Sequence, residues 1–132
     1  METLYCQPIG DETYGFQQVN VEAQQADGGS LWHRMRQMIA TRKAQPALAR
    51  GDVRFLDVDN RAVLAFLRRH EEQTVLAAHN LSAEPVEVAL DLGKYAGAEA
   101  VDVLDGEMLA PVGEAAYGLA LPRYGYRWVR LG

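Results

Sequence analysis

Few residues of this chain have the types and spacing that chemistry at a protein site requires. His33 has Gln37 one helical turn later, where a helical metal site would need its second ligand. His70 precedes Glu71 and Glu72 at a predicted hairpin tip and His79 is alone in a predicted strand, so neither belongs to a metal-binding cluster. The single cysteine, Cys6, has neither a second cysteine nor a nearby base to activate its thiol. The sequence therefore predicts no catalytic residue, no metal site and no cofactor.

One amphipathic helix is predicted over residues 31–44. Ser30 is an N-cap residue type whose hydroxyl can accept a free backbone N–H, and Pro46 disfavours helical geometry at Gln45. The apolar residues recur at a spacing of three to four and make a wide face: Leu31, Trp32, Met35, Met38 and Ile39. Residues 1–29 are predicted to be a loop. Because this face is wider than one small domain needs, we expect it to be an interface with a partner.

From Gly51 onward the apolar period changes to two, which is typical of strands. Turn residues separate seven predicted strands, at 53–58, 62–69, 74–80, 85–91, 99–104, 115–121 and 125–131. The predicted fold class is therefore mainly β, an antiparallel β-sandwich of the Greek-key type preceded by a loop and one helix. The change of period divides the chain into residues 1–50 and 51–132.

The composition excludes several classes of function. The net charge of −5 falls entirely in residues 51–132, because residues 1–50 carry five basic and five acidic side chains. A nucleic-acid-binding protein needs a basic surface, which this distribution does not provide. No apolar stretch approaches the roughly 20 residues of a membrane span, and residues 1–10 lack the pattern of a signal peptide. We expect a cytoplasmic protein with no membrane or nucleic-acid partner.

Two consecutive segments, Tyr14–Gln24 and Ser30–Lys43, carry a resemblance to a known family. They resemble the loop and the eighth helix that close the catalytic barrel of glycoside hydrolase family 13, and most of all its trehalose synthases, or maltose α-D-glucosyltransferases. The β half is similar to the domain C of that family in four segments, at Ala47–Gly51, Asp57–Leu67, Thr74–Ser82 and Leu121–Trp128. Arg127 and Val129 depart from the pattern, since aromatic residues are usual there. The resemblance, which covers residues 4–131 almost continuously, implies that residues 1–50 belong to the barrel.

The resemblance implies a parent enzyme that interconverts maltose and trehalose by intramolecular glucosyl transfer. Retaining enzymes of this kind use one carboxylate as nucleophile and another carboxyl group as acid and base. In the family these groups lie on barrel strands four, five and seven, which precede the segments found here. Asp57 follows Arg54 by three residues, whereas the nucleophile motif of the family has a spacing of two. We therefore expect this chain alone to be non-catalytic.

Two groups of residues are candidates for contact with a sugar. The first lies in the loop that the resemblance places near the active-site rim of the barrel, and consists of Tyr14, Phe16 and Gln17. The second alternates along the last predicted strand, and consists of Tyr124, Tyr126 and Trp128. Alternate residues share one face of a sheet, so an exposed row could stack on sugar rings and a buried row would be core. The apolar neighbours Val129 and Leu131 favour core.

The leading hypothesis is an accessory domain that packs on the catalytic barrel and stabilises it. One alternative is a module that binds maltose, trehalose or an α-glucan. Another is a surface for homo-oligomers, or for the maltokinase that accompanies trehalose synthase in some bacteria. A further alternative is domain C of a related α-glucosidase.

Overall fold

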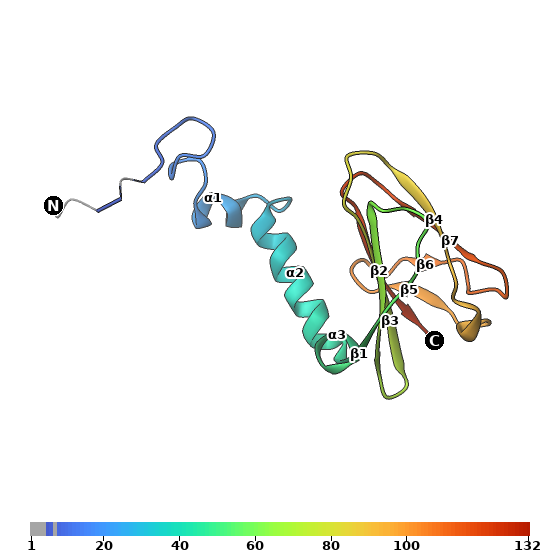
Figure 1. The fold of residues 1–132 in the computed structure, drawn as a ribbon. Coiled ribbons are helices and arrows are strands. Elements are labelled where there is room, and N and C mark those ends of the chain that lie inside the picture. Colours follow the sequence, from blue (N-terminus) through green and yellow to red (C-terminus); the bar gives the residue numbers. More distant parts are fainter. Residues whose placement is uncertain (1–4, 7) are drawn as a thin grey trace. The chain divides into compact units, whose positions relative to one another are not determined.

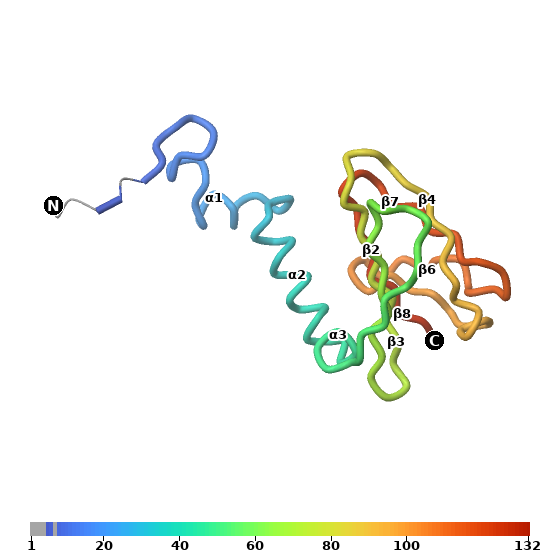
Figure 2. The backbone as a smooth tube through the Cα atoms, viewed as in Figure 1, coloured from blue at the N-terminus to red at the C-terminus, as the bar shows by residue number. Residues whose placement is uncertain are grey.

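The computed structural model describes residues 5–6 and 8–132. Residues 1–4 and 7, which include part of the predicted loop and the start of the family resemblance, lie outside the described residues. The chain divides into two compact units, one ending at Ala40 and one comprising Thr41–Gly132. Figures 1 and 2 trace the helices of the first unit and the strands of the second.

The first helix, α1 (Val21–Ala26), lies where the sequence predicted a loop. Asn20 caps it, because its Oδ1 accepts the N–H of Ala23 at 2.8 Å. The Nδ2 of Asn20 donates to the carbonyls of Phe16 and Gln17, at 3.1 Å each. The prediction of a loop over residues 1–29 is therefore wrong for these six residues. A helix this short shows too little apolar period to be recognised in a sequence.

The second helix, α2 (Leu31–Ala44), has the predicted bounds. Its predicted cap is wrong, because the hydroxyl of Ser30 donates to the carbonyl of Gln24 instead of accepting an N–H from the first turn. The acceptor in that turn is the side chain of Gln24, whose Oε1 lies 3.3 Å from the backbone N of Trp32. Both contacts come from α1, so α1 and the start of α2 hold each other in place.

Pro46 ends α2 as predicted and begins a third helix that was not predicted, α3 (Pro46–Arg50). Proline suits the first position of a helix because the missing N–H has no partner there in any case. Gln73 fixes this helix to the sheet: its Oε1 accepts the N–H of Ala47 at 2.8 Å, and its Nε2 donates to Oε1 of Gln45 at 2.6 Å.

The junction between α3 and the first strand is closely packed at Gly51. A Cβ atom on this residue would lie 2.5 Å from the carbonyl oxygen of Ala47 and 2.7 Å from that of Arg69. Both neighbours are backbone atoms that cannot move independently, so the junction requires glycine.

Eight strands form two antiparallel sheets. The strands are β1 (Asp52–Phe55), β2 (Val63–His70), β3 (Gln73–Asn80), β4 (Val86–Leu90), β5 (Ala100–Asp102), β6 (Met108–Leu109), β7 (Tyr117–Leu121) and β8 (Tyr126–Leu131). The larger sheet has the order β1-β2-β3-β8-β5-β6, and β4 pairs with β7 in the smaller one. Pairing of strands that are distant in sequence, β3 with β8 and β4 with β7, fits the predicted Greek-key type. The predicted sandwich is confirmed, with the two-residue β6 as an additional strand.

The core lies between the two sheets. Alternate residues of β2, β3 and β8 face it from the larger sheet, among them Leu67, Leu76 and Val129. Leu90 of β4 and Leu121 of β7 face it from the smaller sheet. The larger sheet therefore has an inner face, which contacts β4 and β7, and an outer face, which carries the other half of its side chains.

Candidate functional site

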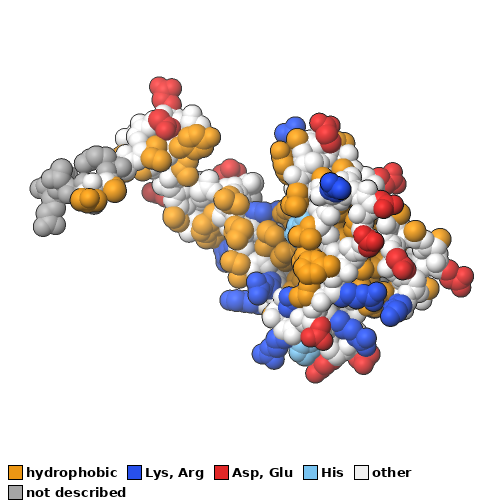
Figure 3. Space-filling model, viewed as in Figure 1, with side chains coloured by type: hydrophobic (Ala, Val, Ile, Leu, Met, Phe, Trp, Pro, Cys, Tyr) orange, Lys and Arg blue, Asp and Glu red, His pale blue; other side chains and the backbone are white. Residues whose placement is uncertain are grey.

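A groove lined mainly by apolar side chains lies between α1 and α2 in the first unit. It encloses about 730 Å³, and its lining includes Val19, Val21, Leu31, Trp32, Met35, Arg36 and Ile39. Leu31 is 69% exposed, Met35 47% and Ile39 50%, and no residue of α2 is buried. Figure 3 shows the hydrophobic side chains gathered over these helices. An exposed apolar surface of this kind is typical of an interface with another part of a protein or with a partner.

Four of the five residues predicted for a partner interface line this groove, namely Leu31, Trp32, Met35 and Ile39. Met38 is half-buried and lies outside it. The guanidinium of Arg36 lies 5.3 Å from the ring centre of Trp32, at a distance suited to a cation–π interaction. The groove thus has one positive group beside its largest aromatic side chain.

The predicted sugar-contacting residues of the N-terminal loop are exposed but do not line the groove. Tyr14, Phe16 and Gln17 all lie at the surface. Asp11 organises the loop by accepting the N–H groups of Thr13 and Tyr14. These two hydrogen bonds lower the pKa of the Asp11 carboxyl, with Tyr14 contributing most.

Two of the three C-terminal aromatic residues lie on the outer face of the larger sheet and not in the core. Tyr126 and Trp128 are half-buried on β8, whereas Val129 and Leu131 point into the sandwich. The expectation that their apolar neighbours favoured core is therefore wrong, because those neighbours occupy the opposite face. Tyr124 precedes the strand, has a φ of 50° and is 64% exposed.

Tyr126 ends a row of rings that crosses four strands of the outer face. The ring centres of Phe55 and Phe66 lie 5.9 Å apart, those of Phe66 and His79 6.1 Å, and those of His79 and Tyr126 6.0 Å. His79 stacks against both neighbours. Burial lowers the pKa of the His79 imidazole, so the ring is neutral at pH 7.

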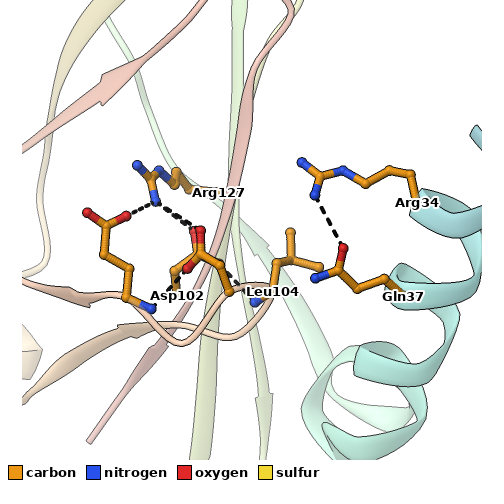
Figure 4. Close-up of polar contacts among 7 residues, drawn as sticks. Arg34, Gln37, Asp102, Leu104 and Arg127 are labelled. Atoms are coloured by element: carbon orange, nitrogen blue, oxygen red, sulfur yellow. Dashed lines mark hydrogen bonds and ion pairs between the residues drawn. The ribbon is translucent and has the colours of Figure 1, made fainter. Parts of the chain in front are cut away.

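A cluster of charged residues surrounds Arg127 at the start of β8. Figure 4 shows the Arg127 guanidinium directed at the carboxylate of Asp102. The two groups lie 3.1 Å apart, Glu107 also bonds to the guanidinium, and an oxygen of Asp105 lies 3.9 Å from it. The second oxygen of Asp102 accepts the N–H of Leu104 at 2.9 Å. The hydrogen bond with Glu107, and then that with Asp102, raises the pKa of Arg127. In the described part of the chain no group of three or more His, Cys, Asp or Glu side chains is arranged to hold a metal ion.

Comparison with the sequence models of known families finds a match in the β half of the chain. The sequence model described as the maltogenic amylase C-terminal domain matches residues 53–128. The chain belongs to this family. The match extends from β1 into β8, so it includes the sandwich and the aromatic row but not the groove between α1 and α2.

Relatives of this family member extend the similarity over nearly the whole chain. The chain is 39% identical to the trehalose synthase of Pimelobacter sp. (strain R48) over 97% of its own length and 23% of that protein. It is 36% identical to the trehalose synthase of Thermus thermophilus over 93% of its length and 13% of that protein. The predicted similarity to trehalose synthases of glycoside hydrolase family 13 is confirmed. The chain spans about a quarter or less of these relatives.

A solved structure supports the fold of this maltogenic amylase C-terminal domain. The crystal structure of the α-glucosyl transfer enzyme XgtA has a TM-score of 0.69 and 36% identity, and the match covers 85% of this chain and 20% of that one. The chain is therefore similar to the C-terminal part of larger enzymes. No helix in the described residues is both long and apolar enough to cross a membrane.

Sequence reasoning missed two features of the domain. The row of rings escaped notice because Phe55, Phe66 and His79 belong to three different strands. Arg127 was noted only as a departure from the family pattern, and its partner Asp102 lies 25 residues away. A signal was nevertheless present, since an arginine in an apolar strand predicts a carboxylate partner.

Proposed function

We propose that this chain is the C-terminal accessory part of a trehalose synthase-like enzyme. Residues 1–50 would then complete the catalytic barrel, and residues 51–132 would form the sandwich that packs beside it. The parent enzyme would interconvert maltose and trehalose by intramolecular glucosyl transfer. The observation that carries the proposal is the apolar groove of α1 and α2, together with relatives that are more than four times longer.

The energetics of the groove support packing against the rest of such an enzyme. Burial of an apolar side chain such as Leu31 or Met35 contributes about 1.5–3 kcal/mol. Three such side chains along α2 are between 47% and 69% exposed. A helix that short gains most of its stability from packing of its apolar face. The rest of the enzyme would bury this face and gain stability from it.

The proposed role is structural and not catalytic. A retaining glycosidase mechanism needs two carboxyl groups about 5–5.5 Å apart, one of them able to attack the sugar. The carboxylates gathered on the sandwich surround Arg127, which pairs with them and ties β8 to β5 and the turn after it. We assign the reacting carboxyl groups to the barrel of the parent enzyme, as the family resemblance implies.

A chimera tests the proposal. The corresponding part of the Pimelobacter trehalose synthase would be replaced by this chain, and conversion of maltose to trehalose would be measured. We expect the chimera to be active, and we expect Met35→Lys to lower its thermal midpoint and the yield of active enzyme. Ala40→Lys is the control, because Ala40 is exposed on the same helix and does not line the groove. Equal effects of the two substitutions would contradict the proposed interface.

A further inference from the structure

A small cavity on the outer face of the larger sheet is separate from the groove. It encloses about 200 Å³ and is lined by Arg42, Leu48, Phe66, Arg68, Ala77, His79 and Trp128. All of these residues belong to the second unit. This volume is large enough for a small anion together with water.

The lining of this cavity is basic, although residues 51–132 carry the whole net charge of −5. Arg42 reaches it from the end of α2 and Arg68 from β2, and no carboxylate lines it. Within residues 5–6 and 8–132, neither arginine forms an ion pair with a carboxylate, whereas Arg127 forms three. Arg42 and Arg68 carry like charges that repel each other at one cavity, and an anion bound there would offset this repulsion.

The surrounding structure holds these groups in place. The Nε of Arg68 donates to the carbonyl of Ala47 at 3.2 Å, so α3 orients the guanidinium. His79 is held by stacking between Phe66 and Tyr126. Stacking uses the faces of the imidazole and leaves its ring nitrogens for hydrogen bonds in the plane. The ring of Trp128 forms an apolar wall.

We infer that this cavity binds a small oxyanion of the phosphate class, held by the guanidiniums of Arg42 and Arg68 with His79 as a further hydrogen-bond donor. Arginine suits this role because its planar fork pairs with two oxygens of a tetrahedral anion. The anion is either inorganic phosphate or the phosphoryl group of an ester whose carbon skeleton contacts Trp128. The inference does not depend on the proposed accessory role, since it concerns the second unit, Thr41–Gly132, alone.

Tryptophan fluorescence tests the inference. Trp32→Phe leaves Trp128 as the only tryptophan of the chain, and inorganic phosphate would be titrated at constant ionic strength. We expect a saturable change that Arg42→Gln and Arg68→Gln each weaken tenfold or more. Arg61→Gln removes the same charge from an exposed turn outside the cavity and should leave the affinity unchanged. No saturation, or an equal loss in the Arg61 variant, would overturn the inference.

Further ligands define the anion. Glucose 1-phosphate that binds at least as tightly as phosphate supports the site, and tighter binding places the sugar ring on Trp128. Acetate or glucose that binds as well as phosphate would overturn the assignment to the phosphate class. Circular dichroism would show whether Arg68→Gln still folds. If Arg68→Gln does not fold, the phosphate affinity of Arg42→Gln tests the inference, because Arg42 is exposed at the end of α2 and its replacement should not disturb folding.

Discussion

Arg127 of β8 and Asp102 of β5 form an ion pair in which the carboxylate is buried and the guanidinium is not. Nη1 of Arg127 lies 3.1 Å from Oδ2 of Asp102. The side chain of Asp102 is 3% exposed and that of Arg127 is 26% exposed. Removing a partner from a buried charge costs more than the pair contributes, because the remaining charge is left unpaired.

Arg127→Leu should therefore destabilise the sandwich by about 2–3 kcal/mol, less than for a fully buried pair because water reaches the guanidinium. The measurement is urea unfolding followed by circular dichroism. Glu107→Gln is the control, since the Glu107 side chain is 52% exposed and its loss should cost less than about 1 kcal/mol. Similar midpoints for Arg127→Leu and the unchanged protein would show that the pair is dispensable.

The buried imidazole of His79 should make stability depend on pH. Burial lowers its pKa below the ordinary value of 6.5, so the unfolded chain binds the proton more readily than the folded one. The contribution of His79 to the free energy of unfolding is therefore complete above about pH 6.5 and is lost as the pH falls below that value. Arg42 and Arg68 line the same cavity from α2 and β2.

Urea midpoints at about pH 7.5 and about pH 5.5 measure this dependence. His79→Gln should reduce the difference between the two midpoints, whereas His33→Gln, which removes a histidine of α2, should leave it in place. A difference that survives in His79→Gln would assign the dependence to other groups.

The groove of α1 and α2 should bind a hydrophobic dye or cause the chain to self-associate. Met35→Lys introduces a charge into its lining, so dye fluorescence and any dimer seen by sedimentation should decrease while the β-sheet signal remains. Ala40→Lys should change neither. A monomer that binds no dye would show that the groove is covered in solution.

Close packing at Gly51 predicts a cost for any side chain there. Gly51→Ala would place a methyl group against two backbone carbonyls, so we expect a loss of about 1–3 kcal/mol in the free energy of unfolding. Gly118→Ala in β7 is the matched control, because nothing lies within 4 Å of the added atom. Equal stability of the two variants would contradict the packing described here.

The predicted sugar contacts remain to be tested by amide NMR titration with maltose, trehalose and a maltooligosaccharide. Shifts confined to Tyr14–Gln17 or to Tyr124–Trp128 would support sugar binding at those places. The exposure of Tyr14, Phe16 and Tyr124 makes such contacts sterically accessible. The absence of a shift with any of the three sugars would count against sugar binding at both places.

Long periodic segments were predictable from the sequence. The helix at residues 31–44 and most of the strands followed from apolar spacing, because burial of one face imposes that spacing. The short elements α1, α3 and β6 depend on individual contacts, such as those of Asn20 and Gln73, and leave no periodic pattern. The aromatic row could not be predicted, nor could the identity of the carboxylates that pair with Arg127, since strand pairing decides which distant residues become neighbours.

The side chain of Gln73 also constrains the order in which this fold assembles. Helix α3 has five residues, too few to persist alone in water, and the N–H of Ala47 finds its acceptor on β3. The β2–β3 hairpin must therefore exist before α3 is stable. Hydrogen exchange at the Ala47 amide would then report the opening of a hairpin tip that is 26 residues away in the chain.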